Sequence, residues 1–342
     1  MFKKFGKIGS LAAVAALSLT VLSACGSNNN NEGAASPSAS ASPSSSAAAS
    51  PSASPSASEA AAPAEVTITH ALGTATVKTN PEKVVVFDYG ALDSLDKLGV
   101  EIAGLPKASL PSYLSKYEDA KYEDVGTLFE PDFEKLAAMK PDVIFIGGRT
   151  GEAYEELNKI APTIQSAVDQ TKYQESFKEL EGWYGQIFSK QAEVDAALSE
   201  IAAAQTDLKA KAEGAGKALI VLTTGGKISA YGSGSRYGVI YDTYGFTAVD
   251  DSIESGTHGQ SISNEYISEK NPDVLFVIDR DVIAGGEGAK PAKEVIENDL
   301  VKKTNAYKNG KIIYLDPEVW YISTGGLTSE LKMVQEASQA VQ

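Results

Sequence analysis

Residues 134–149 read EKLAAMKPDVIFIGGR, and residues 265–280 read EYISEKNPDVLFVIDR. In both segments a glutamate is followed seven positions later by Pro-Asp and fifteen positions later by an arginine. Each pattern predicts a short helix that ends before the proline, because the residue preceding proline avoids helical backbone angles. The apolar run after Pro-Asp does not alternate, which is typical of a strand buried on both faces of a parallel sheet. The repeat therefore predicts two helix–strand units, each followed by an arginine.

Two further segments extend this pattern. Residues 83–105 (KVVVFDYGALDSLDKLGVEIAGL) predict a strand, a helix and a strand. Residues 217–246 (KALIVLTTGGKISAYGSGSRYGVIYDTYGF) predict a strand, a glycine-rich loop that carries Arg236, and a helix. Two copies of alternating strands and helices predict an α/β fold with two Rossmann-like lobes, and we expect a ligand cleft between them.

The region between these lobes, residues 172–214, is rich in Ala, Glu and Lys and contains no proline. Gly182 and Gly185 weaken its start, but the rest strongly favours a helix. We therefore expect an N-terminal lobe at residues 64–171 and a C-terminal lobe at residues 215–342, joined by one long rigid helix. Such a connection allows only small relative motion of the lobes.

The N-terminal 63 residues are different in character. Residues 1–24 combine a basic start with a short apolar run, which predicts a signal peptide and is too short for a membrane span. The tetrapeptide LSAC resembles the bacterial lipoprotein cleavage box, so Cys25 is the expected lipidation site; the alternative is an ordinary secretory signal with an incidental cysteine. Residues 25–63 are mostly Asn, Ser, Ala, Pro and Gly, which predicts a disordered tether.

Charge and cysteine content exclude several classes of function. The net charge of −15 argues against nucleic acid or an anionic membrane surface as the main partner. Cys25 is the only cysteine, which excludes a disulfide framework, a cysteine nucleophile in the folded region and a cysteine-based metal site. The chain also lacks a Cys–His pair, a G-x-S-x-G elbow, a Walker loop and an HExxH motif, so we expect no enzyme activity and no resident cofactor.

The chain contains three arginines, Arg149, Arg236 and Arg280, against 27 lysines. Arg149 and Arg280 follow predicted strands, and ligands of open α/β sheets gather outside the carboxyl ends of strands. Guanidinium is planar, permanently charged and able to donate several hydrogen bonds. Three such groups around one cleft suit a compact anion with carboxylate or catecholate donors. The alternative is three unrelated arginines on the surface or in ion pairs, which would contribute little.

Other polar and aromatic residues are weaker candidates. His258 lies in the glycine-rich stretch GTHGQS and either faces the cleft, where it could bind a metal or a ligand oxygen, or is a solvated loop residue. Trp320 and Tyr321 follow the predicted strand KIIYL. Aromatic residues on a loop at a strand end suit a stacking wall for a ligand with a π system, so both are candidate ligand-binding residues, with Tyr321 preferred as an oxygen ligand to a hard metal. The alternative is that one of them packs into the core while the other caps it.

Glu134 and Glu265 begin the two repeated segments, in or near the first turn of a helix. An acidic residue there complements the helix dipole, which is a sufficient structural explanation. Their matched positions on two lobes also allow a second role, as paired docking contacts for a partner with two-fold symmetry.

Five segments carry a resemblance to a known family: residues 83–105, VGTLFEPDFEKLAAMKPDVIFIGGR, GSGSRYGVIYDTYGF, SNEYISEKNPDVLFVIDR and EVWYISTGG. On these segments, the chain from about residue 65 onward resembles the ABC-importer substrate-binding lipoproteins with a rigid helical backbone. That group binds ferric siderophores, haem and cobalamin, and the match is best to the catecholate and petrobactin-binding subgroup. The resemblance implies that Arg149, Arg236 and Arg280 engage a ferric catecholate and that Glu134 and Glu265 dock on a permease dimer. It also implies that His258 and Tyr321 complete the iron shell when the chelate supplies too few oxygens.

The resemblance implies a protein that captures a ferric siderophore at the outer face of a single-membrane bacterium, held there through the lipid on Cys25. We expect it to act as a monomer. Haem or cobalamin could use the same fold, although a neutral corrinoid would not need three arginines, and hydroxamate chelates of lower charge fit poorly. An anchored hydrolase or a cell-surface adhesin is the alternative from another class, disfavoured by the missing nucleophile and by the two-lobed repeat.

Overall fold

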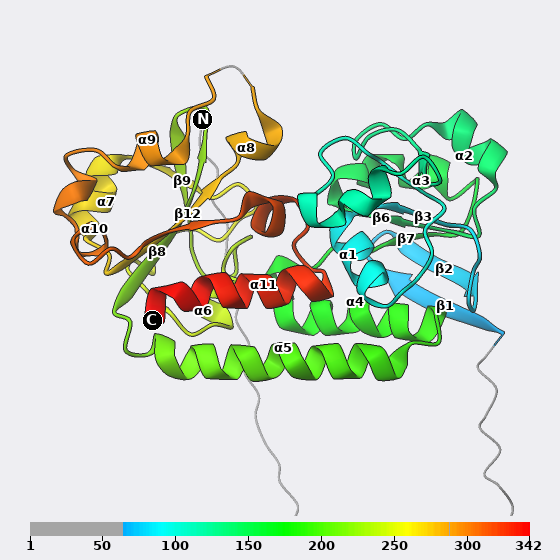
Figure 1. Cartoon of the computed structure of the whole chain (residues 1–342), viewed down its shortest axis with the longest axis horizontal. Coiled ribbons are helices and arrows are strands. Elements are labelled where there is room, and N and C mark those ends of the chain that lie inside the picture. The colour runs from blue at the N-terminus through cyan, green and yellow to red at the C-terminus, as the bar shows by residue number, and fades with distance from the viewer. Residues whose placement is uncertain (1–63, 287) are drawn as a thin grey trace, which may run out of the picture. The chain divides into compact units, whose positions relative to one another are not determined.

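The computed structural model describes residues 64–286 and 288–342, and both of its lobes belong to one compact unit (Figure 1). The predicted signal peptide (residues 1–24), Cys25 and the predicted tether (residues 25–63) lie outside the described residues.

The N-terminal lobe contains a five-stranded parallel sheet with the order β5-β4-β3-β6-β7. An antiparallel hairpin of β1 and β2 precedes it in the chain. The elements of this lobe are β1 (Glu65–His70), β2 (Gly73–Lys78), β3 (Val84–Phe87), α1 (Tyr89–Lys97), β4 (Gly104–Leu105), β5 (Glu123–Asp124), α2 (Phe133–Met139), β6 (Val143–Ile146), α3 (Tyr154–Leu157) and β7 (Thr163–Gln165).

The C-terminal lobe contains a sheet with the order β11-β9-β8-β12-β13, and β10 also pairs with β8. The pairs β8–β12, β12–β13 and β10–β8 are parallel, whereas β9 and β11 are added antiparallel at one side. The elements are β8 (Lys217–Thr224), β9 (Lys227–Tyr231), α6 (Val239–Asp242), β10 (Thr247–Ala248), β11 (Gln260–Ile262), α7 (Asn264–Lys270), β12 (Val274–Asp279), α8 (Asp281–Ala284), α9 (Ala292–Ile296), α10 (Asn305–Lys308), β13 (Ile312–Leu315) and α11 (Leu327–Ala337).

The structure confirms the predicted repeat and explains its Pro-Asp pairs. Helices α2 and α7 end at Lys140 and Asn271, both of which adopt left-handed backbone angles immediately before a proline. The strands that follow, β6 and β12, are buried on both faces apart from the last residue of β12. The aspartates stabilise neighbouring strand starts: Asp142 accepts from the Lys83 amide at 2.8 Å and Asp273 from the Lys217 amide at 2.9 Å.

The region predicted as a strand followed directly by a glycine-rich loop contains an additional strand. Residues KISAY form β9, which pairs antiparallel with β8. Gly225 and Gly226 have φ values of 54° and 74°, and two consecutive residues with positive φ are what a tight hairpin turn requires. The Gly-Gly pair therefore marks a hairpin, and Arg236 lies in the loop after β9.

The prediction of a single connecting helix at residues 172–214 was wrong in its extent. The segment forms two packed helices, α4 (Tyr173–Ile187) and α5 (Gln191–Ala212), separated by a break in which Ser189 has φ 54°. Gly185 allows the start of α5 to pack closely against α4, since a Cβ there would lie 3.2 Å from the Gln191 Cα. Only α5 is the long connecting helix of the prediction.

Helix α11 provides a second connection between the lobes. It packs against α5 and also against α1 of the N-terminal lobe (Figure 1). Its first turn is held by α1, because Asp93 accepts from the Ser329 amide at 2.6 Å and the Ser94 hydroxyl accepts from the Leu327 amide at 3.0 Å. The last helix of the chain is therefore bonded to the first lobe. None of the helices in the described ranges is long and apolar enough to cross a membrane.

Candidate ligand-binding site

Two of the three arginines stand where a central strand ends. Arg149 follows β6 after Gly147 and Gly148, and Arg280 follows β12 directly. Gly147 is required here, because a Cβ at this position would collide with the carboxylate of Asp88. Both arginines are half-buried. The strand-end rule that predicted their position therefore places one from each lobe at the same cleft.

Arg236 reaches the cleft from the loop between β9 and α6. The glycines of GSGSRYG allow backbone segments of this loop to pack closely. A Cβ at Gly232 would lie 2.6 Å from the Ile253 carbonyl oxygen, and one at Gly238 would lie 2.8 Å from the Gly234 amide nitrogen. In the structure they fold the loop that presents Arg236.

All three arginines converge on Tyr321, which lies in the π-helical turn Glu318–Ile322. Arg149 Nη2 and Arg236 Nη2 donate to the Tyr321 carbonyl oxygen at 3.0 and 2.7 Å. Arg280 Nε donates to the Tyr321 hydroxyl at 2.8 Å, and its Nη1 donates to Thr224 Oγ1 at 2.9 Å. The arrangement bonds the N-terminal lobe to the C-terminal lobe and holds three guanidinium groups in fixed orientations.

The guanidinium groups also change the electrostatics of Tyr321. Their carbon atoms lie 4.5 to 5.6 Å from the centre of its ring, within the range of cation–π attraction. Burial by itself raises the pKa of the Tyr321 phenol, but the hydrogen bond from Arg280 and the charges of the three arginines outweigh it and lower the pKa. The phenol is therefore easier to deprotonate than an ordinary tyrosine.

These residues line a cavity of about 530 Å³ between the lobes. Its permanently charged lining groups are the three arginines, and its one carboxylate is Asp88. Burial raises the pKa of Asp88, against the lowering effects of a hydrogen bond from the Ala91 amide and of Arg149. In a chain with a net charge of −15, the cavity is a concentrated cationic site that favours an anionic ligand.

His258 lines the same cavity from an exposed loop. The backbone there is held by Tyr231, whose hydroxyl donates to the His258 carbonyl at 3.2 Å. Next to it, Thr257 Oγ1 lies 3.4 Å from Gln170 Oε1 of the opposite lobe. Among the described residues no three His, Cys, Asp or Glu side chains gather in a way that would hold a bare metal ion.

The prediction of Trp320 as a ligand-binding residue was wrong. Trp320 is 0% exposed and does not line the cavity. Its indole nitrogen donates to Glu336 at 3.0 Å, and its ring packs edge-to-face against Tyr244. Adjacent residues on a helical turn point in different directions, so the burial of Trp320 in the core accompanies the projection of Tyr321 into the cleft.

Sequence reasoning missed several residues that line the cavity. Asp88 stands at the carboxyl end of β3, next to β6 in the sheet, so the rule that found Arg149 applies to it equally. Phe129 is 67% exposed and lies in the segment VGTLFEPD, where nothing in the local pattern distinguishes it from a core residue. The remaining polar lining residues are Ser166, Gln170, Tyr173, Thr257 and Thr324.

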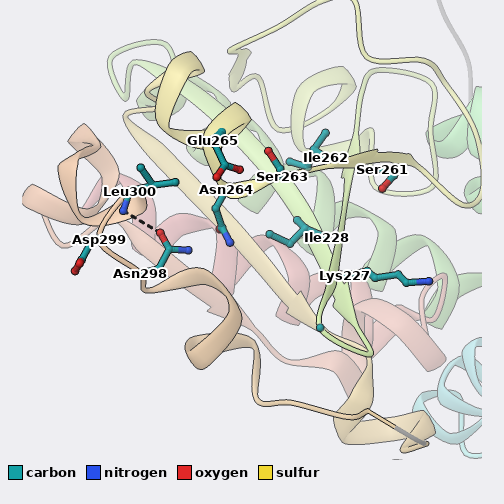
Figure 2. Close-up of a pocket in the computed structure, with 11 residues that line it drawn as sticks. Lys227, Ile228, Ser261, Ile262, Ser263, Asn264, Glu265, Asn298, Asp299 and Leu300 are labelled. Atoms are coloured by element: carbon teal, nitrogen blue, oxygen red, sulfur yellow. Dashed lines mark hydrogen bonds between the residues drawn. The ribbon is translucent and has the colours of Figure 1, made fainter.

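Glu134 and Glu265 occupy matched places outside the cleft. Each is exposed and is the second residue of its helix, α2 or α7. A hydrogen bond with Ser263 lowers the pKa of Glu265, which keeps its carboxylate charged. Glu265 lines a surface hollow of about 600 Å³ together with polar and apolar side chains from β9, from β11, from the start of α7 and from residues 298–300 (Figure 2).

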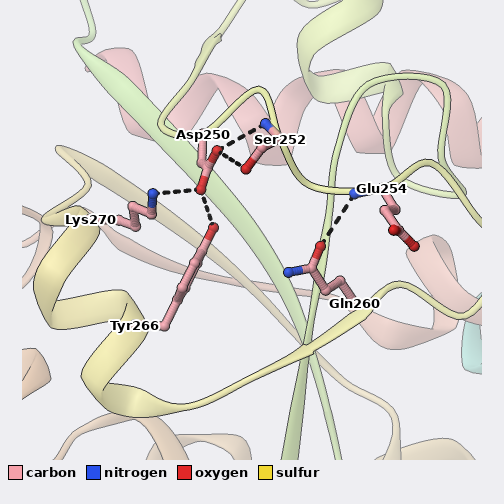
Figure 3. A network of polar contacts seen from close by, with 6 residues as sticks. All are labelled: Asp250, Ser252, Glu254, Gln260, Tyr266 and Lys270. Atoms are coloured by element: carbon pink, nitrogen blue, oxygen red, sulfur yellow. Dashed lines mark hydrogen bonds and ion pairs between the residues drawn. The ribbon is translucent and has the colours of Figure 1, made fainter.

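A hydrogen-bond network anchors the helix that carries Glu265 (Figure 3). Asp250 Oδ2 accepts from the Tyr266 hydroxyl and pairs with Lys270 Nζ, both at 2.7 Å, and its Oδ1 accepts from the Ser252 hydroxyl at 2.6 Å. The bonds from Lys270, Ser252 and Tyr266 lower the pKa of Asp250 far below its ordinary value. Asp250 therefore holds α7 both at Tyr266 in its first turn and at Lys270 at its last residue, and Glu265 projects from a helix that is anchored at both ends.

Comparisons with known proteins agree with this architecture. The model of the periplasmic binding protein family matches residues 84–319. The petrobactin-binding protein YclQ of Bacillus subtilis is 50% identical over 284 residues, which cover 81% of this chain and 89% of YclQ. The ferric-anguibactin-binding protein FatB of Vibrio anguillarum is 36% identical over 79% of this chain and 85% of FatB.

Solved structures show the same relationship. The crystal structure of YclQ superimposes with a TM-score of 0.78 at 49% identity and covers 81% of this chain and 99% of YclQ. That of the catecholate-siderophore binding protein VctP from Vibrio cholerae gives a TM-score of 0.76 at 38% identity, over 80% of this chain and 99% of VctP. The chain therefore belongs to the periplasmic binding protein family, whose members bind substrates for ABC importers.

Proposed function

We propose that the protein binds a ferric catecholate-type siderophore outside the cell and delivers it to an ABC permease for iron uptake. The observation that carries the proposal is that Arg149, Arg236 and Arg280 all line the interlobe cavity and are each hydrogen-bonded to Tyr321. A ferric catecholate is a compact anion whose surface carries oxygen atoms that can accept hydrogen bonds. Guanidinium groups match such oxygens by charge and by hydrogen bonding.

The relatives support the same class of ligand. YclQ is named for petrobactin, FatB for ferric anguibactin and VctP for catecholate siderophores. The higher identity to YclQ favours a petrobactin-like ligand for this chain. The protein's work is then selective capture without catalysis, which agrees with the absence of a nucleophile motif in the sequence.

A ligand panel tests this function. Quenching of tryptophan fluorescence in the purified mature chain is measured with ferric petrobactin, ferric enterobactin, ferrichrome, haemin and cyanocobalamin. We expect sub-micromolar affinity for the catecholate-bearing complexes and at least 100-fold weaker binding of the neutral ferrichrome and cyanocobalamin. The reason is that only an anionic ligand offsets the free-energy cost of removing water from the three guanidinium groups. Preference for haemin or for a neutral ligand would contradict the proposal.

We further propose that His258 and Tyr321 bind iron directly when the chelate leaves coordination positions open. The lowered pKa of Tyr321 favours the phenolate that a hard ferric ion prefers. With the ferric complex of a tetradentate bis-catecholate added to the panel, His258→Ala and Tyr321→Phe should each shift the visible charge-transfer band of the bound complex. With a hexadentate tris-catecholate they should not, and a shift of equal size in both cases would argue against direct coordination.

Glu134 and Glu265 are proposed as the docking contacts for the two halves of a permease dimer. Their exposure, their matched positions and the rigid support of α7 favour this role. The double variant Glu134→Ala/Glu265→Ala should bind the ferric siderophore within twofold of the wild type, yet cellular uptake of labelled iron should fall about 10-fold. Glu269→Ala, on the same helix as Glu265, serves as the control. Unchanged uptake in the double variant would remove these residues from the interface.

We propose that a lipid on Cys25 holds the protein, as a monomer, at the outer face of the membrane of a Gram-positive bacterium. The LSAC box and the length of the Ser/Ala/Pro-rich segment support this location. Cys25→Ala should abolish incorporation of a labelled fatty acid and move the protein from the membrane fraction to the medium. Retention in the membrane fraction would contradict the anchor. Light scattering of the detergent-free Cys25→Ala protein should give the mass of one chain.

A further inference from the structure

The π-helical turn Glu318–Ile322, which carries Tyr321, is held at its first residue by the opposite lobe. Ser112 begins a 3₁₀ turn of the N-terminal lobe and donates to Glu318 Oε2 from its backbone amide at 2.8 Å and from its hydroxyl at 2.6 Å. Both donors reach the same carboxylate oxygen, although the two residues are 206 positions apart in the chain. The carboxylate of Glu318 is therefore fixed by a segment of the other lobe.

The main chain of Glu318 is held from the same segment. The Tyr113 hydroxyl donates to Ser323 Oγ at 2.8 Å, and Ser323 Oγ donates in turn to the Glu318 carbonyl oxygen at 2.6 Å. That carbonyl also accepts from the Ser323 amide at 3.2 Å, which is the bond that closes a π-helical turn. Lys332 of α11 supports the Tyr113 ring, because its ammonium nitrogen lies 3.6 Å from the ring centre. Adjacent residues of the N-terminal lobe thus hold both polar groups of Glu318.

The turn presents the carbonyl and the hydroxyl of Tyr321 to the three arginines. A π-helical turn is a rare geometry that occurs often at functional sites. Because hydrogen bonds weaken steeply when their angles are poor, a turn that moves loses part of its bonding to the guanidinium groups. Ser112, Tyr113 and Glu318 lie outside the lining of the arginine cavity. Their contacts therefore reach the ligand site through the turn.

We propose that Ser112, Tyr113 and Glu318 are positioning residues that set Tyr321 in register with the three arginines. The N-terminal lobe thereby fixes a group that the C-terminal lobe carries, so the relative position of the lobes and the orientation of Tyr321 are coupled. The effect on ligand affinity rests on the proposed function, whereas the effect on Tyr321 is a property of the free protein. The two effects are measured separately.

Ionisation of the Tyr321 phenol in the free protein reports its position. The bond from Arg280 and the charges of the three arginines lower the pKa of Tyr321, so a phenol that moves away from them is harder to deprotonate. The neighbouring tyrosines, Tyr231 and Tyr237, have raised pKa values because they are buried, so they stay neutral while Tyr321 titrates. The titration is followed by NMR of the purified mature chain with its tyrosines isotopically labelled at Cζ, and Tyr321→Phe identifies the resonance.

Glu318→Ala and Tyr113→Phe should each lower the acid dissociation constant of the Tyr321 phenol about fivefold. Loss of the Glu318 charge alone acts in the opposite direction, since a negative charge nearby disfavours the phenolate. Glu318→Gln removes that charge and keeps an oxygen that accepts both bonds from Ser112, so it should show no such fall. The affinity for a ferric catecholate should drop about tenfold in Glu318→Ala and stay within about twofold of the wild type in Glu318→Gln.

Glu297→Ala is the matched control. Glu297 is a half-buried carboxylate of the same lobe that accepts from the Tyr314 hydroxyl at 3.1 Å and lies outside the cavity lining, so its loss should change neither quantity.

The outcomes separate the inference from the proposed function. The inference is overturned if the phenol of Glu318→Ala titrates as in the wild type or at lower pH, or if Glu318→Gln shows an equal fall. It is also overturned if the titration shifts while the affinity of a binding-competent protein does not. If the wild type binds no ferric catecholate, the proposed function fails, and the titration of Tyr321 in the free protein still decides the inference.

Discussion

Arg236→Ala is expected to weaken the binding of a ferric catecholate about 100-fold in the fluorescence titration. Removing one partner of a desolvated, hydrogen-bonded charge pair costs about 2–5 kcal/mol, and a 100-fold change corresponds to roughly 3 kcal/mol. The fold should tolerate the substitution, because the Tyr321 carbonyl that Arg236 contacts at 2.7 Å retains its bond from Arg149. The loss should therefore appear in affinity and not in stability.

Two further variants make this result specific. Arg236→Lys keeps the charge but loses the planar arrangement of donors, so we expect an intermediate loss of about 10-fold. Lys302→Ala removes an exposed cation away from the cavity and should leave the affinity unchanged. If Arg236→Ala binds the ferric catecholate as tightly as the wild type does, Arg236 has only a structural role and the site proposed above is wrong.

Among the substitutions considered, Glu330→Ala is expected to cause the largest fall in the free energy of unfolding. Glu330 lies on α11 with 0% exposure and accepts hydrogen bonds from the Tyr173 hydroxyl at 2.7 Å, the Tyr244 hydroxyl at 2.9 Å and Gln205 Nε2 at 3.0 Å. The substitution leaves three buried donors without their acceptor. We expect a loss of about 4 kcal/mol in the free energy of unfolding and a fall in Tm of about 10 °C.

The matched variants are Glu330→Gln, which preserves shape and one acceptor oxygen, and Glu193→Ala, which removes an exposed carboxylate from α5. We expect losses of about 1–2 kcal/mol for the first and less than about 0.5 kcal/mol for the second. A loss below about 1 kcal/mol in Glu330→Ala would show that solvent reaches the three donors and that the cluster does not hold the helices together.

Glu330 also predicts a dependence of stability on pH. Burial raises the pKa of this carboxyl, and the bonds from Tyr173, Tyr244 and Gln205 oppose the rise only in part. A carboxyl whose folded pKa lies above its unfolded value of about 4.3 contributes full stability below that value and loses it as the pH rises through the folded pKa. The stability advantage of the wild type over Glu330→Gln in urea unfolding should therefore shrink as the pH rises above the unfolded pKa of about 4.3.

The sequence determined those features that rest on local chemistry. The prolines after α2 and α7 disfavour right-handed helical angles at the residue before them, so each helix ends there. The apolar runs of β6 and β12 have no polar face, as expected of strands buried on both sides. The helix–strand units therefore follow from the residues alone. Because an arginine follows the end of each strand, the carboxyl-end rule was sufficient to place Arg149 and Arg280 at the cleft. The same rule applies to Asp88, which follows β3 directly.

Only the tertiary structure decided the features that depend on contacts between distant segments. Trp320 and Tyr321 are adjacent aromatics, and their different fates depend on the direction in which the turn meets Tyr244 on one side and the arginines on the other. The break between α4 and α5 depends on the contact of Gly185 with Gln191, and the burial of Glu330 depends on donors 86 to 157 positions away in the chain. Residue type and spacing describe what a side chain can do, whereas the packing of the two lobes decides which groups it meets.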